Sequence, residues 1–170
     1  MLRAEPGERG TRRKTRGGSQ PRVYGIDYIW NGVHNMSMKW EVVFYDEFDE
    51  EFKALDEELQ DELLAHAILL RDYGPNLGRP TVDTLKGSKH ANMKELRFDW
   101  EKEVWRVAFA FDPKRRAVLL VGGDKAGVDQ KRFYRRLIAV ADGRFERHLA
   151  SLSAKRKGRT GKETGHGKKP

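Results

Sequence analysis

Two arginines in neighbouring predicted strands are the side chains best suited to chemistry. Arg97 and Arg106 both lie in segments whose β-branched and aromatic content predicts strands. Strand alternation puts Arg106 on the same face as Ala108 and Ala110, which leaves room for a ligand beside the guanidinium. A guanidinium can hold a phosphate through two parallel hydrogen bonds. The alternative interpretation is that each arginine is exposed and pairs with a nearby carboxylate, namely Glu95, Glu101 or Glu103.

Three further residues could take part in chemistry on a phosphate or a base. Lys125 follows the Gly122-Gly123 pair, where a flexible turn lets a cation approach a backbone phosphate closely. Tyr134, near the start of the last predicted helix, could stack on a base. His90 lies in a loop and titrates in the range that general acid–base catalysis needs. Each also has a plain structural interpretation, as a solvated lysine, a packed aromatic residue and a solvated histidine.

Other basic residues predict contacts with an RNA backbone. These are Lys86, Lys89 and Lys94, in or beside the loop before the Met93 strand, and Arg132 at the start of the last helix. No His, Asp or Glu spacing predicts a metal site, and no cofactor is expected. Residues 122–125, Gly-Gly-Asp-Lys, lack the spacing of a nucleotide-binding phosphate loop.

The charge is unevenly distributed along the chain, which has a net charge of +8. Residues 39–72 contain 3 basic and 12 acidic residues, whereas residues 73–153 contain 17 basic and 10 acidic ones. A polyanion would therefore be repelled by the first part and attracted to the second.

The elements that must position these residues follow a clear order. Residues 39–45 predict a strand, and apolar residues spaced by three and four from Phe48 to Leu70 predict two helices broken near Leu55. Residues 82–85, 93–98, 104–111 and 117–121 predict strands, the last three forming an antiparallel meander. Asp129 could cap a final helix. The fold class is α+β: a small, curved, antiparallel and partly mixed sheet with two N-terminal helices and one C-terminal helix.

The domain organisation follows from composition. Residues 38–153 form the predicted domain, residues 1–37 a disordered basic extension and residues 154–170 a disordered basic tail. Translation starting at Met36 or Met38 is a further hypothesis. Cysteine is absent, and no apolar run predicts a membrane span or a signal peptide, so a cytoplasmic location is expected.

Several segments, taken in order over roughly residues 38–150, carry a family resemblance: residues 73–80, 82–87, 93–97, 105–111, 119–125 and 131–134. Together they resemble the RelE/ParE toxin superfamily, and in particular its phage-derived Gp49-like or HigB-like group. This resemblance implies a toxin of a type II toxin–antitoxin system. Such a toxin would be an endoribonuclease that cleaves ribosome-bound mRNA through attack by the ribose 2′-hydroxyl, without a metal.

The resemblance also implies roles and partners. Arg106 matches the family's phosphate-binding arginine, Lys125 a position that is often basic, and Tyr134 a tyrosine that stacks on a base or assists proton transfer. A small helix-turn-helix antitoxin, the ribosome and mRNA are the implied partners. Met93 and Glu95 depart from the pattern, since the RelE type carries two catalytic lysines there. Acid–base chemistry would then fall to His90, Lys94 or Tyr134, or to Glu95 if its strand face is right.

Two other functions remain open from the sequence. A ParE-like inhibitor of DNA gyrase would share the fold. A non-catalytic RNA-binding relic of the family would fit the departures at Met93 and Glu95.

Overall fold

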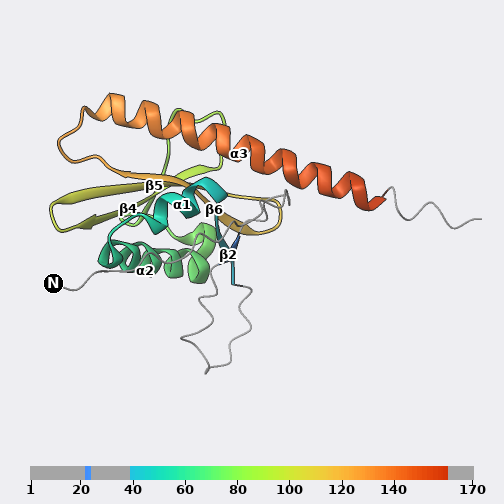
Figure 1. Ribbon diagram of the computed structural model, residues 1–170, viewed down its shortest axis with the longest axis horizontal. Coiled ribbons are helices and arrows are strands. Elements are labelled where there is room, and N and C mark those ends of the chain that lie inside the picture. The colour runs from blue at the N-terminus through green and yellow to red at the C-terminus, as the bar shows by residue number, and fades with distance from the viewer. Residues whose placement is uncertain (1–21, 24–38, 161–170) are drawn as a thin grey trace, which may run out of the picture.

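The structure is a computed structural model that describes residues 22–23 and 39–160, with side chains described from Lys39 to Lys157. Its elements, labelled in Figure 1 where there is room, are β1 (Arg22–Val23), β2 (Glu41–Phe44), α1 (Asp46–Lys53), α2 (Glu57–Tyr73), the 3-10 helix η2 (Gly74–Asn76), β3 (Val82–Thr84), β4 (Met93–Trp100), β5 (Glu103–Phe111), β6 (Arg116–Asp124) and α3 (Gln130–Thr160). The predicted α+β class and the order of helices and strands are confirmed.

The strands form one mixed sheet in the order β1-β2-β6-β5-β4-β3. The predicted meander is present, because β4, β5 and β6 pair antiparallel with their neighbours. β2 pairs parallel with β6, and this pairing places the first long strand beside the last one. The meander brings the two predicted arginines together, since Arg97 and Arg106 are directly opposite each other on β4 and β5.

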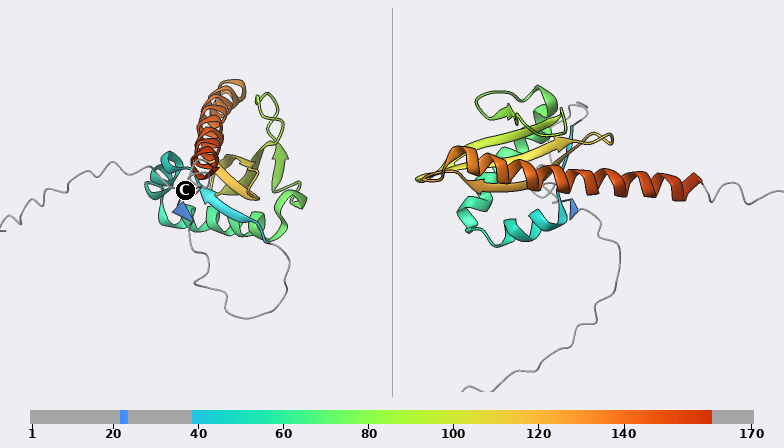
Figure 2. Two further views of the ribbon diagram at one scale, coloured as in Figure 1. Left: turned by 90° about the vertical axis from the view of Figure 1, so that its right-hand side faces the viewer. Right: turned by 90° about the horizontal axis from the view of Figure 1, so that it is seen from above.

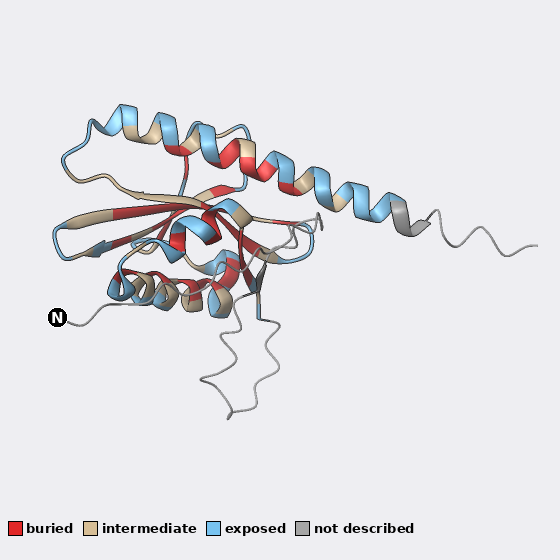
Figure 3. Cartoon of the chain, viewed as in Figure 1, coloured by how far each residue is buried: buried red, intermediate tan, exposed pale blue. Residues whose placement is uncertain are grey.

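Each face of the sheet carries its own apolar core. α1 and α2 cover one face, where Phe48, Leu63 and Leu70 are buried against the strands. α3 crosses the other face, where Leu137, Ala141 and Phe145 are buried. In the left view of Figure 2, α3 and α2 lie on opposite sides of the sheet. Figure 3 shows buried residues in the middle of α3, whereas the described residues toward either side of the middle are largely exposed.

Local sequence sets the ends of the helices. Asp56 caps α2 by accepting a hydrogen bond from the Glu58 amide at 3.0 Å, which explains the predicted break before it. At the other end, Gly74 has a positive φ of 53°, and a Cβ there would meet the Trp40 ring at 2.2 Å. Asp129 precedes α3 and accepts the Arg132 amide at 2.7 Å, so its predicted capping role is confirmed.

The domain boundaries predicted from composition differ from the elements in two places. α3 continues to Thr160, through residues predicted as tail, because a helix once begun adds one backbone hydrogen bond per residue. β1 lies within the predicted N-terminal extension and pairs with β2, a contact that needs only backbone groups. Met36 and Met38 lie outside the described residues.

Arg144 links α3 to the sheet and to α1 through a hydrogen bond and an ion pair. Arg144 is buried and donates to the Leu120 carbonyl oxygen at 2.7 Å and to the Glu51 carboxylate of α1.

Among the described residues, no helix is long and apolar enough to cross a membrane.

A second buried polar cluster, centred on Asp112, predicts how the free energy of unfolding depends on pH. The Asp112 side chain is fully buried. Its Oδ2 lies 2.6 Å from Arg116 Nη2 and 2.9 Å from His148 Nε2. Burial would raise the pKa of Asp112, but the bonds to His148 and Arg116, together with the Arg116 amide and the Arg116 charge, outweigh it and lower the pKa to about 2, from 3.8. Because the folded pKa is lowered, the stabilisation is present above pH 4 and is lost as the pH falls through about 2.

We therefore expect this carboxylate to account for about 2 kcal/mol of the loss in unfolding free energy between pH 5 and pH 2. Urea unfolding across this range should show a shallower pH dependence for Asp112→Asn than for the wild type. Asp99→Asn, at an exposed carboxylate of β4, is the control and should keep the wild-type slope. Parallel slopes for the wild type and Asp112→Asn would contradict the assignment.

Candidate active site

Arg106 lies beneath the N-terminal part of α3. It shares the α3 face of β5 with Ala108 and Ala110, as alternation predicts, and Arg106 is only 5% exposed. Its Nη1 donates to the Trp105 carbonyl oxygen at 2.7 Å. Its Nε is buried and has no hydrogen-bond partner within the described chain. A buried donor without a partner is costly and marks a group that a ligand could satisfy.

Glu95 lies on the same face, two residues before Arg97 on β4. It is 6% exposed, and its Oε1 is 3.8 Å from Arg97 Nε. Its Oε2 is buried without a hydrogen-bond partner among the residues described. The other side of the Arg97 guanidinium contacts Asp83 Oδ2 at 3.2 Å, so Arg97 is held between two carboxylates. The predicted pairing of Arg97 with Glu95 is thus present, and it lies inside the candidate site.

Tyr134, in the second turn of α3, covers Glu95 and Arg106. Burial raises the pKa of its hydroxyl, the Glu95 carboxylate raises it further, and Arg106 partly opposes the shift. The hydroxyl therefore faces both the acid and the guanidinium and stays protonated at neutral pH. It can donate a proton or a hydrogen bond to an oxygen in this space. We define Glu95, Arg97, Arg106 and Tyr134 as the site cluster.

Phe133 and Lys125 flank the site cluster at the end of β6. Gly123 is opposite Arg106 in the sheet, and a Cβ at Gly123 would lie 3.5 Å from the Phe133 ring. Lys125 comes two residues later and is held by its amide, which donates to the Val104 carbonyl at 3.0 Å. Its side chain forms no ion pair with any residue described. Arg132 is exposed on the first turn of α3.

His90 lies away from the site cluster, contrary to the sequence prediction. Its ring packs edge-on against Phe145 at 5.0 Å, and its Nε2 is 3.9 Å from Glu146. Phe145 follows Tyr134 by eleven residues, which is about 16 Å along a helix. The loop is fixed there because buried Asp142 accepts from Ser88 Oγ at 2.5 Å and from the Lys89 amide at 3.1 Å.

Of the basic loop residues, Lys89 and Lys94 also lie away from the site cluster. The ammonium group of Lys89 pairs with Glu146 at 3.5 Å, beside His90. Lys94 alternates with Arg97 and Glu95 in β4, so it lies on the α2 face together with Leu96. Lys86 is exposed in the same loop as His90. A sequence cannot show that Asp142, 54 residues after Ser88, holds this loop against α3.

From the sequence, Glu95 is a possible base only if its strand face is right. The face can be found from the sequence by alternation alone, because Glu95 and Arg97 are two residues apart and Arg97 is opposite Arg106. What alternation could not show was the burial of the carboxylate and its contact with Tyr134.

Two hollows open on the surface beside α3. One, of about 650 Å³, is lined by Asp129, Gln130, Lys131, Tyr134, Arg135 and Ile138. It borders the site cluster through Tyr134. Within the described residues, no group of three His, Asp or Glu side chains could hold a metal ion.

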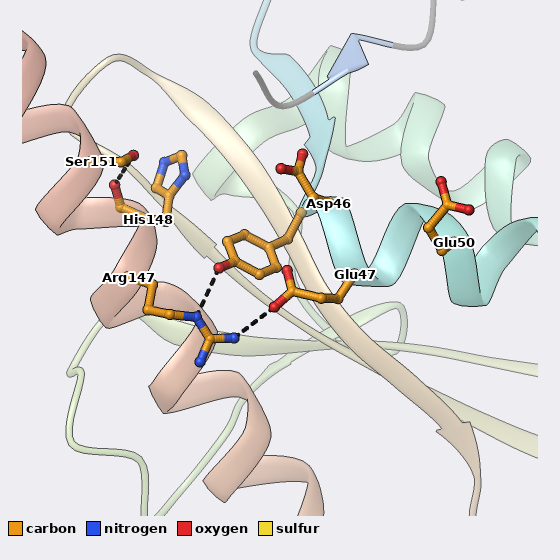
Figure 4. A pocket seen from close by; sticks show the side chains of 7 residues that line it. Asp46, Glu47, Glu50, Arg147, His148 and Ser151 are labelled. Carbon is orange, nitrogen blue, oxygen red and sulfur yellow. Dashed lines mark hydrogen bonds and ion pairs between the residues drawn. The ribbon is translucent and has the colours of Figure 1, made fainter. Parts of the chain in front are cut away.

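The other hollow, of about 490 Å³, lies further along α3 and is shown in Figure 4. Arg147 crosses its wall, with Nε 3.0 Å from the Tyr45 hydroxyl and Nη2 2.8 Å from Glu47. Arg147 is thus already occupied by these contacts. None of the residues predicted for the site lines this hollow.

Comparison with known proteins identifies the family. The model of the phage derived protein Gp49-like family (DUF891) matches residues 50–146, and the chain belongs to this family. The resemblance to the Gp49-like, HigB-like group expected from the sequence is therefore confirmed.

Two curated relatives come from Mycobacterium tuberculosis (strain ATCC 25618 / H37Rv). "Putative toxin HigB2" is 45% identical over 100 residues, which cover 58% of this chain and 49% of that protein. "Putative toxin HigB3" is 44% identical over 110 residues, which cover 65% of this chain and 94% of that protein. The match thus spans about half the length of HigB2 and nearly all of HigB3.

Among solved structures, a double-arginine mutant of the E. coli toxin RelE in the free state matches with a TM-score of 0.43 and 10% sequence identity. The match covers 60% of this chain and 96% of the RelE chain.

Proposed function

We propose that this protein is the toxin of a type II toxin–antitoxin system and that it cleaves messenger RNA on the ribosome. The observation that carries the proposal is the site cluster, in which one carboxylate, two guanidinium groups and one phenol converge on a single face of the sheet. Membership of the Gp49-like family and the toxin names of HigB2 and HigB3 support the same function.

The proposed reaction needs groups that the cluster contains. Glu95 takes the proton from a ribose 2′-hydroxyl, whose oxygen then attacks the adjacent phosphorus. The bond from phosphorus to the 5′-oxygen breaks, which leaves a 2′,3′-cyclic phosphate, and the Tyr134 hydroxyl gives its proton to the departing oxygen. Arg106 and Arg97 stabilise the negative charge that develops on the phosphate oxygens.

Burial of the cluster also fits a site that excludes water. At 5% exposure for Arg106 and 6% for Glu95, both groups lie under Tyr134. The substrate phosphate therefore has to enter beneath the Tyr134 side chain to reach them, which leaves the Tyr134 hydroxyl beside the departing oxygen. When it binds, it supplies the partner that Arg106 Nε lacks, and fixed charges in such a dry site act more strongly than in water.

The proposal includes partners and a location. The activity would require the ribosome and mRNA as partners in the cytoplasm. Control of such an activity requires an antitoxin, for which a small helix-turn-helix protein is the expected class.

The function is tested by inducing the wild-type chain and mapping transcript 5′-ends. We expect growth to stop and new 5′-ends to accumulate within translated frames. A reporter transcript without a start codon is the control and should stay intact. Growth arrest without new ends would favour a gyrase inhibitor, and continued growth would favour a non-catalytic relic.

A further inference from the structure

The first two turns of α3 carry four cations without a partner. Lys131, Arg132, Arg135 and Arg136 are all exposed. Within the described part of the chain, their side chains take part in no ion pair or hydrogen bond. By contrast, two basic side chains further along α3, Arg144 and Arg147, are paired with glutamates of α1.

This placement opposes the electrostatics of the helix itself. The N-terminal end of a helix is its positive end, and α3 has no acidic residue in its first turn. Lys131 and Arg135 are four residues apart, as are Arg132 and Arg136, so each pair brings like charges together on one face. Such an arrangement does not stabilise α3, and a polyanion would relieve it.

Two of the four cations border the site cluster. Lys131 and Arg135 line the hollow of about 650 Å³ together with Tyr134. Tyr134 in turn faces Arg106 and Glu95, which are more than nine-tenths buried and each have an unpartnered polar atom. The acid of the hollow, Asp129, is already engaged with the Arg132 amide. The hollow therefore combines two unpaired cations with Tyr134, the residue that faces the unpartnered groups.

We propose that Lys131 and Arg135 bind backbone phosphates of the substrate RNA strand next to the one that is cleaved. The inference rests on the proposed ribonuclease function and names the path of its substrate. The strand runs along the α3 hollow, its phosphates contact the two cations, and the scissile phosphate enters under Tyr134. Each cation contributes to affinity through the release of counterions from the RNA.

The test is binding of a short fluorescein-labelled RNA with 2′-O-methyl riboses, which lacks the attacking hydroxyl. Full-length wild type is compared by fluorescence anisotropy with the double variant Lys131→Gln and Arg135→Gln. We expect affinity to fall on the order of tenfold at low salt, and the slope of log affinity against log salt to decrease by about 1.4. The control is Lys114→Gln with Lys155→Gln, two exposed lysines away from the hollow, and it should match the wild type.

Three further readouts separate this proposal from its alternatives. The double variant should keep or raise the wild-type Tm, because it removes like-charge repulsion, and a lower Tm would assign these residues to the fold instead. Unchanged oligonucleotide binding, with or without weaker binding to ribosomes free of mRNA, would overturn the proposal. If the RNA binds as expected but the wild type cleaves no message, Lys131 and Arg135 still bind RNA phosphates and the proposed nuclease function is wrong.

Discussion

Replacing Arg106 by alanine is expected to reduce mRNA cleavage by a factor of about 100 to 1,000. Loss of one positioned donor to a developing negative charge has an effect of this size. Arg106 is the more buried of the two arginines in the site cluster, and its Nε, which has no hydrogen-bond partner within the described chain, gives a phosphate oxygen a donor. Cleavage should be measured with a translated reporter message and purified ribosomes, and the rate compared with that of the wild type.

A buried arginine also contributes to packing, so a second variant is needed. Arg106→Lys keeps a cation and most of the volume but loses the two-pronged geometry, and it should retain about a tenth of the activity. Arg147→Ala is the matched control, since this arginine lies in the other hollow beside Tyr45, and it should cleave like the wild type. Full activity of a folded Arg106→Ala protein would remove Arg106 from the mechanism.

Replacing Glu95 by glutamine should reduce cleavage by about 100 to 10,000 fold, the contribution typical of a general base. Glutamine keeps the shape of the side chain but does not accept a proton from the 2′-hydroxyl. Binding of the 2′-O-methyl RNA should be retained, because Glu95 makes no attractive contact with a phosphate. The cleavage rate at saturating ribosomes, together with the binding constant, tests both statements.

The control for this variant is Glu58→Gln, at an exposed position in the first turn of α2. Glu95→Asp keeps the carboxylate one methylene shorter and should restore part of the rate. If Glu95→Gln and Glu95→Asp are equally inactive, Glu95 acts by holding Arg97 or Tyr134 in place and not as a base. If both are fully active, another group is the base.

The strands and the face of Arg106 could be predicted because they depend on local sequence. Period-two alternation set Arg106 beside Ala108 and Ala110, and the short polar links between β4, β5 and β6 set the meander. From these two facts the pairing of Arg97 with Arg106 follows within one or two residues. Lys125 at the strand end and Tyr134 on the last helix were also predicted close to where they lie.

The misplaced residues depend on contacts between distant segments. His90 was expected near the basic face. Instead, Asp142 of α3 accepts a hydrogen bond from the loop that carries His90, and the His90 ring packs on Phe145. The burial of Arg106 was also beyond the sequence, because it depends on how far α3 crosses the sheet. That position is fixed by Arg144, which bonds to Glu51, 93 residues earlier in the chain.

The order of elements along the chain has a consequence for synthesis of the protein. Every strand of the described sheet precedes α3, and α3 supplies both Tyr134 and the Arg144 anchor to α1. A nascent chain that has emerged only as far as β6 thus has its sheet arginines but lacks the phenol and the covering helix. The cluster is completed only after the last described helix leaves the exit tunnel. The ribosome that makes this protein therefore carries an unfinished site until α3 has emerged.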